Sequence, residues 1–217
     1  MSNPDSFIDE VNEELRRDRL FAAMRKWGWV AAVGVVLLVG GAAWNEWRKA
    51  QAESQARAFG DQIIAALDRE TPGERRDALA AVTASGAQAG ILNLLLAATE
   101  IDAGRPEGAL TALAAVEADA TLPLSYRQIA ALKRVILAGD RLPIAEREAT
   151  LNGLATPGQP FRPLALEQLA ILALEAGQTA TALERARALL QEPDVSQGLR
   201  QRVEQLIVIL GGETANG

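Results

Sequence analysis

The four tryptophans of the chain lie within a single 21-residue window. Trp27 and Trp29 stand at its start and Trp44 and Trp47 at its end, and the run between them, Gly28 to Ala43, has no charged residue. A helix rises about 1.5 Å per residue, so this window covers roughly 30 Å, the thickness of a bilayer's hydrocarbon core. Tryptophan is enriched at both membrane interfaces. The pattern predicts a membrane-spanning helix with all four tryptophans as membrane-interface residues.

Two other interpretations of this segment are weaker. A helix buried in a soluble core would have no reason to place tryptophans at both ends of an uncharged run. A cleaved signal peptide is disfavoured because the run is longer than a typical signal core and because the preceding segment is long and partly acidic. Gly41, Ala42 and Ala43 resemble a cleavage site only weakly, and Trp44 would be an unusual first residue of a mature chain. We therefore expect an uncleaved anchor.

Lysine and arginine are distributed unevenly around the predicted span, and positive residues favour the cytoplasmic side. Before the span stand Arg16, Arg17, Arg19, Arg25 and Lys26. Within a similar distance after it stand only Arg48, Lys49 and Arg57. We expect a single-pass protein of a bacterial inner membrane, with its N-terminus in the cytoplasm and its C-terminal domain in the periplasm.

Composition excludes several classes of function. The formal net charge of −6 argues against nucleic-acid binding, because phosphates are bound by basic surfaces. The chain has no cysteine and no histidine, which removes the usual ligands of a zinc site and two common catalytic side chains. The serines after the span are isolated, and no glycine-rich phosphate loop occurs. We expect a non-enzymatic protein with no cofactor, no metal site and no small-molecule substrate.

Glycines recur at a near-constant interval after the span. They are separated by 31, 35, 38 and 34 residues and stand at Gly73, Gly104, Gly139, Gly177 and Gly211. A period in this range is typical of stacked helical hairpins. Each glycine is expected to end one amphipathic helix, where the backbone often needs positive φ. The helix of the span is expected to continue to about Arg69, with Thr71-Pro72-Gly73 as its stop.

Small residues stand at a fixed distance from most of these glycines. Ala78, Ala109 and Ala182 each lie five residues beyond a glycine, where a small side chain lets the second helix of a hairpin close on the first. At the matching position after Gly139 the chain has Ile144. We expect that hairpin to be the degenerate one.

This pattern resembles the tetratricopeptide repeat. Leu96-Ala97 and Leu169-Ala170 occupy the places of the family's paired large and small residues, ahead of the inter-helix glycines and the second-helix alanines. The chain departs from the family where its tryptophan and first-helix tyrosine would stand, with Asn93 and Glu100 in one repeat and Leu166 and Ala173 in another. The resemblance implies an all-α chain, with one N-terminal transmembrane helix followed by a solenoid of helical hairpins.

The layout of the whole chain resembles the YfgM-type ancillary subunits of the SecYEG translocon. The shared features are a short acidic tail, a glycine-rich span flanked by tryptophans, the run Trp44-Asn45-Glu46-Trp47-Arg48, and about 170 residues of divergent repeats. The predicted parts are a cytoplasmic amphipathic tail at 1–26, a transmembrane helix at 27–47, a repeat domain at 48–211 and a disordered tail at 212–217.

The resemblance also implies a function. It predicts a non-enzymatic, membrane-tethered periplasmic interaction module that accompanies the translocon and contacts exported clients or periplasmic chaperones, with membrane lipid around the span. A structural assembly or scaffold subunit of another inner-membrane complex is the alternative. In a tetratricopeptide stack the first helices line a concave face. The predicted client-binding groove therefore consists of Ile91, Leu94, Ile101, Tyr126, Ile129, Lys133, Leu164, Glu167 and Ile171.

The arginine bias generates a topology prediction. A reporter that is active only outside the cytoplasm is expected to be active when fused after Gly217 and inactive when fused before Met1. Enzyme activity of the two fusions in intact cells provides the measurement. The reverse pattern would place the repeats in the cytoplasm and contradict a periplasmic function.

Overall fold

The computed structural model describes residues 4–193 and 195–212, and in that part of the chain all regular structure is helical. The all-α class predicted from the sequence is therefore confirmed. The contacts divide the chain into two units, Met1–Ala58 and Phe59–Gly217. The helices are α1 Pro4–Leu67, α2 Pro72–Ala80, α3 Ala87–Asp102, α4 Pro106–Ala118, α5 Leu124–Ala138, α6 Ile144–Leu154, α7 Arg162–Glu175, α8 Thr179–Leu190 and α9 Gln197–Ile209, with a short 3-10 helix at Gly139–Arg141.

Helix α1 contains the apolar segment. Within the described residues, Gly28–Leu67 is the one helical stretch long and apolar enough to cross a bilayer, judged by length and composition, and its apolar 18-residue window has a mean hydropathy of 1.6. The side chains from Val35 to Val39 are exposed, and the rings of Trp44 and Trp47 lie 5.1 Å apart on one side of the helix. The side chain of Trp27 lies outside the described part of the chain. The limits of the predicted tail, span and repeat domain stay predictions.

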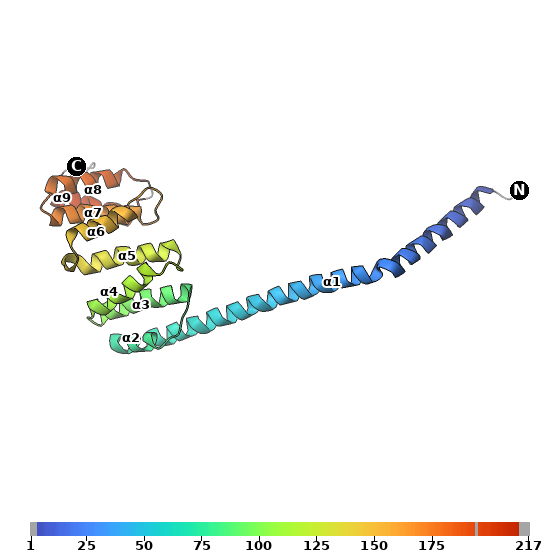
Figure 1. Ribbon diagram of the computed structural model, residues 1–217. Helices are drawn as coiled ribbons and strands as arrows, with labels where there is room; N and C mark the ends of the chain where they lie inside the picture. The colour runs from blue at the N-terminus through green and yellow to red at the C-terminus, as the bar shows by residue number, and fades with distance from the viewer. Residues whose placement is uncertain (1–3, 194, 213–217) are drawn as a thin grey trace. The chain divides into compact units, whose positions relative to one another are not determined.

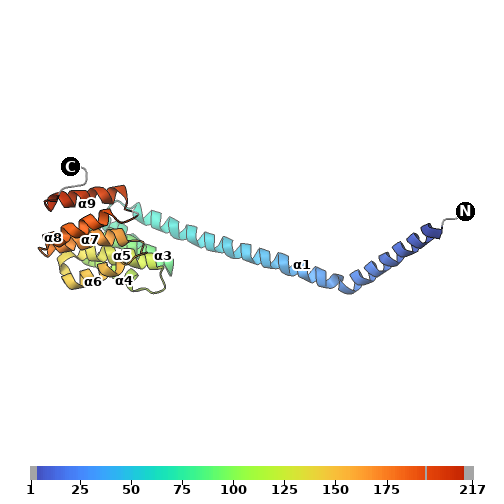
Figure 2. The same ribbon diagram turned by 90° about the horizontal axis from the view of Figure 1, so that it is seen from above.

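The second unit is a stack of helical hairpins. The end of α1 packs with α2 through a core that contains Ile63 and Leu79. Helices α3 and α4, α5 and α6, and α7 and α8 then pair in chain order, and α9 packs on α8. Figures 1 and 2 show these helices following one another through the unit from α2 to α9. This arrangement confirms the predicted succession of hairpins.

The glycine pattern predicts most of the helix ends. Gly104, Gly139 and Gly177 have φ values of 70°, 53° and 74° and lie where the first helix of a hairpin gives way to the second, and Gly211 follows α9 with φ 77°. Only a residue without a Cβ adopts such values at no steric cost.

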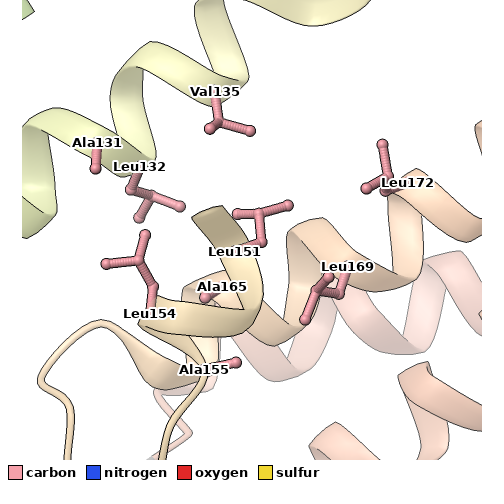
Figure 3. Packing of buried hydrophobic residues seen from close by; sticks show 9 residues of the cluster. All are labelled: Ala131, Leu132, Val135, Leu151, Leu154, Ala155, Ala165, Leu169 and Leu172. Atoms are coloured by element: carbon pink, nitrogen blue, oxygen red, sulfur yellow. The ribbon is translucent and has the colours of Figure 1, made fainter. Parts of the chain in front are cut away.

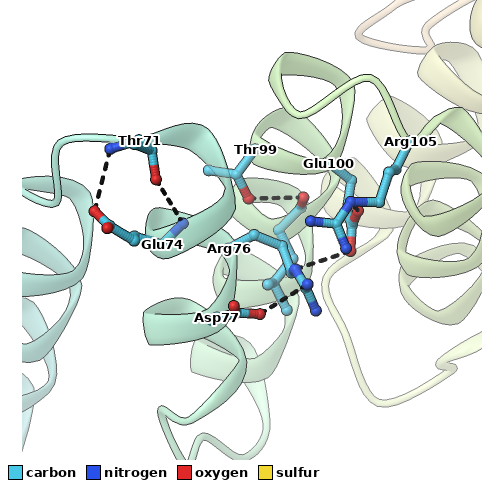
Figure 4. Close-up of polar contacts among 8 residues, drawn as sticks. Thr71, Glu74, Arg76, Asp77, Thr99, Glu100 and Arg105 are labelled. Atoms are coloured by element: carbon cyan, nitrogen blue, oxygen red, sulfur yellow. Dashed lines mark hydrogen bonds and ion pairs between the residues drawn. The ribbon is translucent and has the colours of Figure 1, made fainter.

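Gly73 is an exception, and its prediction was wrong. Helix α1 ends at Leu67, and Gly73 lies in the first turn of α2. Thr71 caps α2: its hydroxyl oxygen accepts from the Glu74 amide at 3.2 Å, and the Glu74 carboxylate accepts from the Thr71 amide at 3.3 Å (Figure 4). A threonine followed by proline and, three residues on, by glutamate is a helix start rather than a stop.

The small residues of the repeat lie where paired helices meet. Ala109 of α4 and Ala182 of α8 are 0% exposed, as the expected close approach of the two helices requires. Ala97 shares a buried cluster with Ala109, so α3 and α4 meet through small side chains. Ile144, at the matching position of α6, is exposed instead. The α5–α6 hairpin is therefore the degenerate one, as predicted.

Leucines fill the space between successive hairpins. In Figure 3, Leu132 and Val135 of α5 face Leu151 and Leu154 of α6. Leu169 of α7 belongs to the same buried cluster. One core therefore joins the degenerate hairpin to the next, and α6 is held between α5 and α7.

Each junction between neighbouring hairpins also has an arginine–glutamate pair. The pairs are Arg76 with Glu100, Arg134 with Glu117, Arg147 with Glu175 and Arg202 with Glu167, at N–O distances of 3.8, 2.6, 2.6 and 2.8 Å. Hydrogen bonds from the guanidinium groups to their partner carboxylates raise the pKa of Arg134 and Arg202. A guanidinium matches a carboxylate in geometry and is well suited to join two helices.

Glu100 explains one departure from the repeat pattern. Its carboxylate lies between the guanidinium groups of Arg76 and Arg105, at 3.8 Å from each (Figure 4). A Cβ added to Gly108 would lie only 2.7 Å from the carboxyl carbon of Glu100. Gly108 therefore leaves room for an acidic side chain where the family has a tyrosine.

The zero exposure of the hairpin alanines generates a stability prediction. Ala109→Leu and Ala182→Leu each overpack a helix pair and are expected to lower the free energy of unfolding by about 1–3 kcal/mol. Ala115→Leu, at an exposed position of α4, is expected to change it by less than about 0.5 kcal/mol. Urea unfolding of the full chain in detergent, followed by far-UV circular dichroism, measures all three. Equal effects would show that helix separation is not set by these alanines.

Candidate partner-binding surface

Exposed large apolar side chains in the second unit concentrate on one class of helix. In the described part of that unit, all but one of them lie on α1, α3, α5 or α9. Helices α1, α3 and α5 are the first helices of their hairpins, and α9 has the corresponding position after α8 in the alternation of first and second helices. Ile144 on α6 is the exception. We call this set the first-helix face: it consists of Ile64, Leu67, Ile91, Ile101, Leu124, Ile136, Val208 and Ile209.

The predicted groove residues differ in how far they are exposed to solvent. Ile91, Ile101 and Lys133 are exposed and available to a partner. Five others, Leu94, Tyr126, Ile129, Leu164 and Ile171, are half-buried, and Glu167 is buried. The groove as a whole stays a prediction.

The half-buried residues help to pack the hairpins together. Leu94 and Tyr126 lie against the core that α3 and α4 form, and Ile129 lies against the core shared by α5, α6 and α7. A Cβ on Gly90 would approach the Tyr126 ring to 3.2 Å, so the absence of a side chain there leaves space for the tyrosine. Leu164 contacts the cores on both sides of α7.

Glu167 has a structural role in this arrangement. Its two carboxylate oxygens accept from Nε and Nη2 of Arg202 at 2.8 and 3.0 Å, which joins α7 to α9. A buried carboxylate that already accepts two hydrogen bonds from an arginine has little capacity left to bind a partner protein.

The groove predicted from the sequence did not include Ile136. Ile136 is 51% exposed and lies seven residues after Ile129, two turns further along the same side of α5. A small cavity lies nearby, lined by Ile136 and Gln168 together with Arg147, Ile171 and Glu175. Ile136 lies seven residues after Ile129 and three after Lys133, and this helical spacing indicates that it shares a side of the helix with them.

The exposed large side chains of the first-helix face are aliphatic. Among the residues whose side chains are described, no group of three His, Cys, Asp or Glu residues is placed to hold a metal ion. Lys133 on α5 is also exposed, and Glu175 lines the same small cavity as Ile136. Such a surface binds another polypeptide by burying apolar area.

The comparisons with known proteins agree with this architecture. The chain matches the family model of the tetratricopeptide repeat-like domain over residues 24–151, more than half of its length. It therefore belongs to the tetratricopeptide repeat-like family, whose domains typically bind other proteins and are not catalytic. The α7–α8 hairpin lies beyond the matched range and repeats the same pattern. Neither the curated proteins nor the solved structures gave a match.

The division between core and exposed residues generates a mutational prediction. Changing Leu94 and Ile129 together to aspartate introduces two carboxylates at half-buried positions that pack against the cores, and is expected to cost about 3 kcal/mol or more of unfolding free energy. Ile91→Asp and Ile136→Asp are expected to change it by less than about 0.5 kcal/mol each, because both side chains reach water. Thermal unfolding by circular dichroism distinguishes the two classes. A stable, fully helical L94D/I129D chain would show that these residues are not core.

Proposed function

We propose that this protein is a membrane-tethered interaction module that accompanies the secretion translocon and contacts exported chains or periplasmic chaperones. The observation that carries the proposal is the concentration of exposed apolar side chains on the first helices. Scattered apolar residues would need no explanation, but all except Ile144 of the exposed large apolar side chains described in the second unit lie on α1, α3, α5 and α9, which favours a binding surface.

Helix α1 supplies the evidence for the proposed membrane tether. Its apolar segment is long enough to span a bilayer, and the exposed valines and leucines from Val35 to Val39 would be covered by lipid. Trp44 and Trp47 would lie at one interface. The arginine excess before the segment favours a cytoplasmic N-terminus, and with that orientation the repeats would lie in the periplasm.

Tethering makes weak binding effective. An anchored domain stays near the membrane channel that it serves, and a short linker gives effective concentrations of roughly millimolar order. At such a concentration, a binding site formed by a few isoleucines would be occupied by its partner even if its affinity were weak. The translocon itself is supported by the resemblance of the whole layout to the YfgM-type subunits.

Two isoleucines of one hairpin provide a matched test. A photoreactive phenylalanine derivative is placed in the full chain at Ile136, on the first helix, or at Ile144, on the second, where exposure is 51% and 43%. Crosslinking in native bacterial membranes is expected to give adducts with translocon subunits and exported chains from position 136 and at least several-fold fewer from position 144. Mass spectrometry identifies the adducts.

Other outcomes distinguish the alternatives. One stable adduct with a resident subunit of a different membrane complex, unchanged when export is blocked, would favour the scaffold function. Equal adduct yields from the two positions would contradict the first-helix face as a binding surface.

A further inference from the structure

Helix α9 is the last helix in the described part of the chain, and there no second helix follows it (Figure 2). It packs on α8 and is joined to α7 through Arg202 and Glu167. A solenoid normally ends in a repeat whose outer side is polar. Here that side carries Val208 and Ile209, which are 60% and 76% exposed, and Ile209 is the most exposed large apolar side chain described in the second unit. This end of the solenoid is therefore incompletely capped.

Four residues form a line along the outer side of α9. Gly198, Gln201, Gln205 and Val208 follow one another at intervals of three, four and three residues, and all four are exposed and uncharged. This is the heptad spacing with which one helix packs along another. Residues 213–217 of the sequence contain no large apolar side chain with which to cover this line. We call the four residues the outer stripe of α9.

The outer stripe is complementary to a copy of itself. In an antiparallel helix pair with two-fold symmetry, each residue lies opposite the one that is equally far from the axis. When the axis passes at the level of Val203, Val208 lies opposite Gly198 of the second copy, and Gln201 lies opposite Gln205. A Cβ added to Gly198 would meet no atom within 4 Å, so there is open space over this glycine for the valine. The glutamine amides can donate to and accept from each other.

Charged residues beside the stripe fit the same arrangement. Arg200 and Glu204 are four residues apart and therefore lie on one side of α9. An antiparallel two-fold pair places like sides of the two helices next to each other. With the axis at Val203, Glu204 of each copy lies within about 3 Å, measured along the helix, of Arg200 of the other copy. A second copy thus supplies opposite charges at these positions, although the whole chain has a net charge of −6.

The size of the contact determines where it can form. Helix α9 has 13 residues. It is therefore about 20 Å long and about 10 Å wide, so one face covers on the order of a few hundred Å². A stable dimer in solution buries about 800 Å² on each partner. Pairing through α9 therefore needs the high local concentration that results when both copies are anchored in one membrane.

We propose that α9 packs antiparallel against α9 of a second copy of this chain, which joins two membrane-tethered repeat domains into a dimer. The helix that would cover the last repeat is then supplied by the other copy. The inference uses the tether of the proposed function but none of its partners. Ile91, Ile101 and Ile136 of the first-helix face take no part in the contact.

Cysteine pairs test this register, because the unaltered chain has no cysteine. Full-length chains with Gln201→Cys and with Gln205→Cys carry different affinity tags, are produced together in bacterial membranes, and are then treated with a mild oxidant. A disulfide requires that two Cα atoms come within about 7 Å. The mixed 201–205 disulfide is expected at several-fold higher yield than either variant joined to itself, because like positions are offset by about 6 Å along the helix. Ala115→Cys, exposed on α4, is the control and is expected to give no dimer.

Substitutions beside and within the stripe test its chemistry in the same cysteine background. Glu204→Arg in both chains is expected to lower the mixed disulfide yield several-fold, and its combination with Arg200→Glu is expected to restore the yield, because opposite charges again face each other. Val208→Asp is expected to lower the yield as strongly, since it places a carboxylate against the second helix. Circular dichroism of each variant is expected to match that of the unaltered chain, because none of the three side chains is buried.

Several results would overturn the inference. Equal yields from mixed and like cysteine pairs would indicate random collision in the membrane, and disulfides from like pairs alone would indicate parallel helices. A photoreactive residue at position 208 that captures another protein and no second copy would assign the outer stripe to that protein. In each case adducts from position 136 would leave the proposed function in place. Loss of those adducts while the mixed disulfide persists would contradict the proposed function and support the dimer.

Discussion

The close approach of paired helices through alanine is the contact on which the rest of this structure depends. Ala109 and Ala182 have no exposed surface, and Ala170 and Ala186 share one buried cluster between α7 and α8. With larger side chains at these points the helices would separate, and leucines such as Leu113 and Leu189 would no longer be enclosed. When two paired helices meet through small residues, the first helix can bury the side that faces its partner. The isoleucines on its other side then stay exposed to solvent.

Polar contacts then fix how one hairpin joins the next. Leucine cores are tolerant of small sliding movements, but an arginine held by a carboxylate, as Arg202 is by Glu167, defines one register. The first junction differs from the others, because Arg76 and Glu100 stand 3.8 Å apart without a direct hydrogen bond. Glu100 is also the residue that replaces the family's tyrosine.

Period and composition predicted the fold well, and individual side-chain directions less well. Glycines at intervals of 31 to 38 residues gave the hairpins, because positive φ is a local requirement that sequence shows directly. Gly73 was misplaced because the adjacent Thr71 and Pro72 start a helix. Glu167 was expected to face a partner, but its bond to Arg202 depends on a residue 35 positions away, which no local pattern reveals. Ile136 was missed although its spacing from Ile129 was helical.

Residues that contact one another in the second unit are separated by few positions in the sequence. Among the described residues, side-chain hydrogen bonds between helices join residues no more than 37 positions apart, the separation of Arg185 and Glu148. Each hairpin therefore needs only its immediate neighbours to complete its core. A repeat domain whose hairpins become available in chain order can fold one hairpin at a time, with loop-closure costs that stay small and nearly constant along its length. Folding can then keep pace with delivery of the chain.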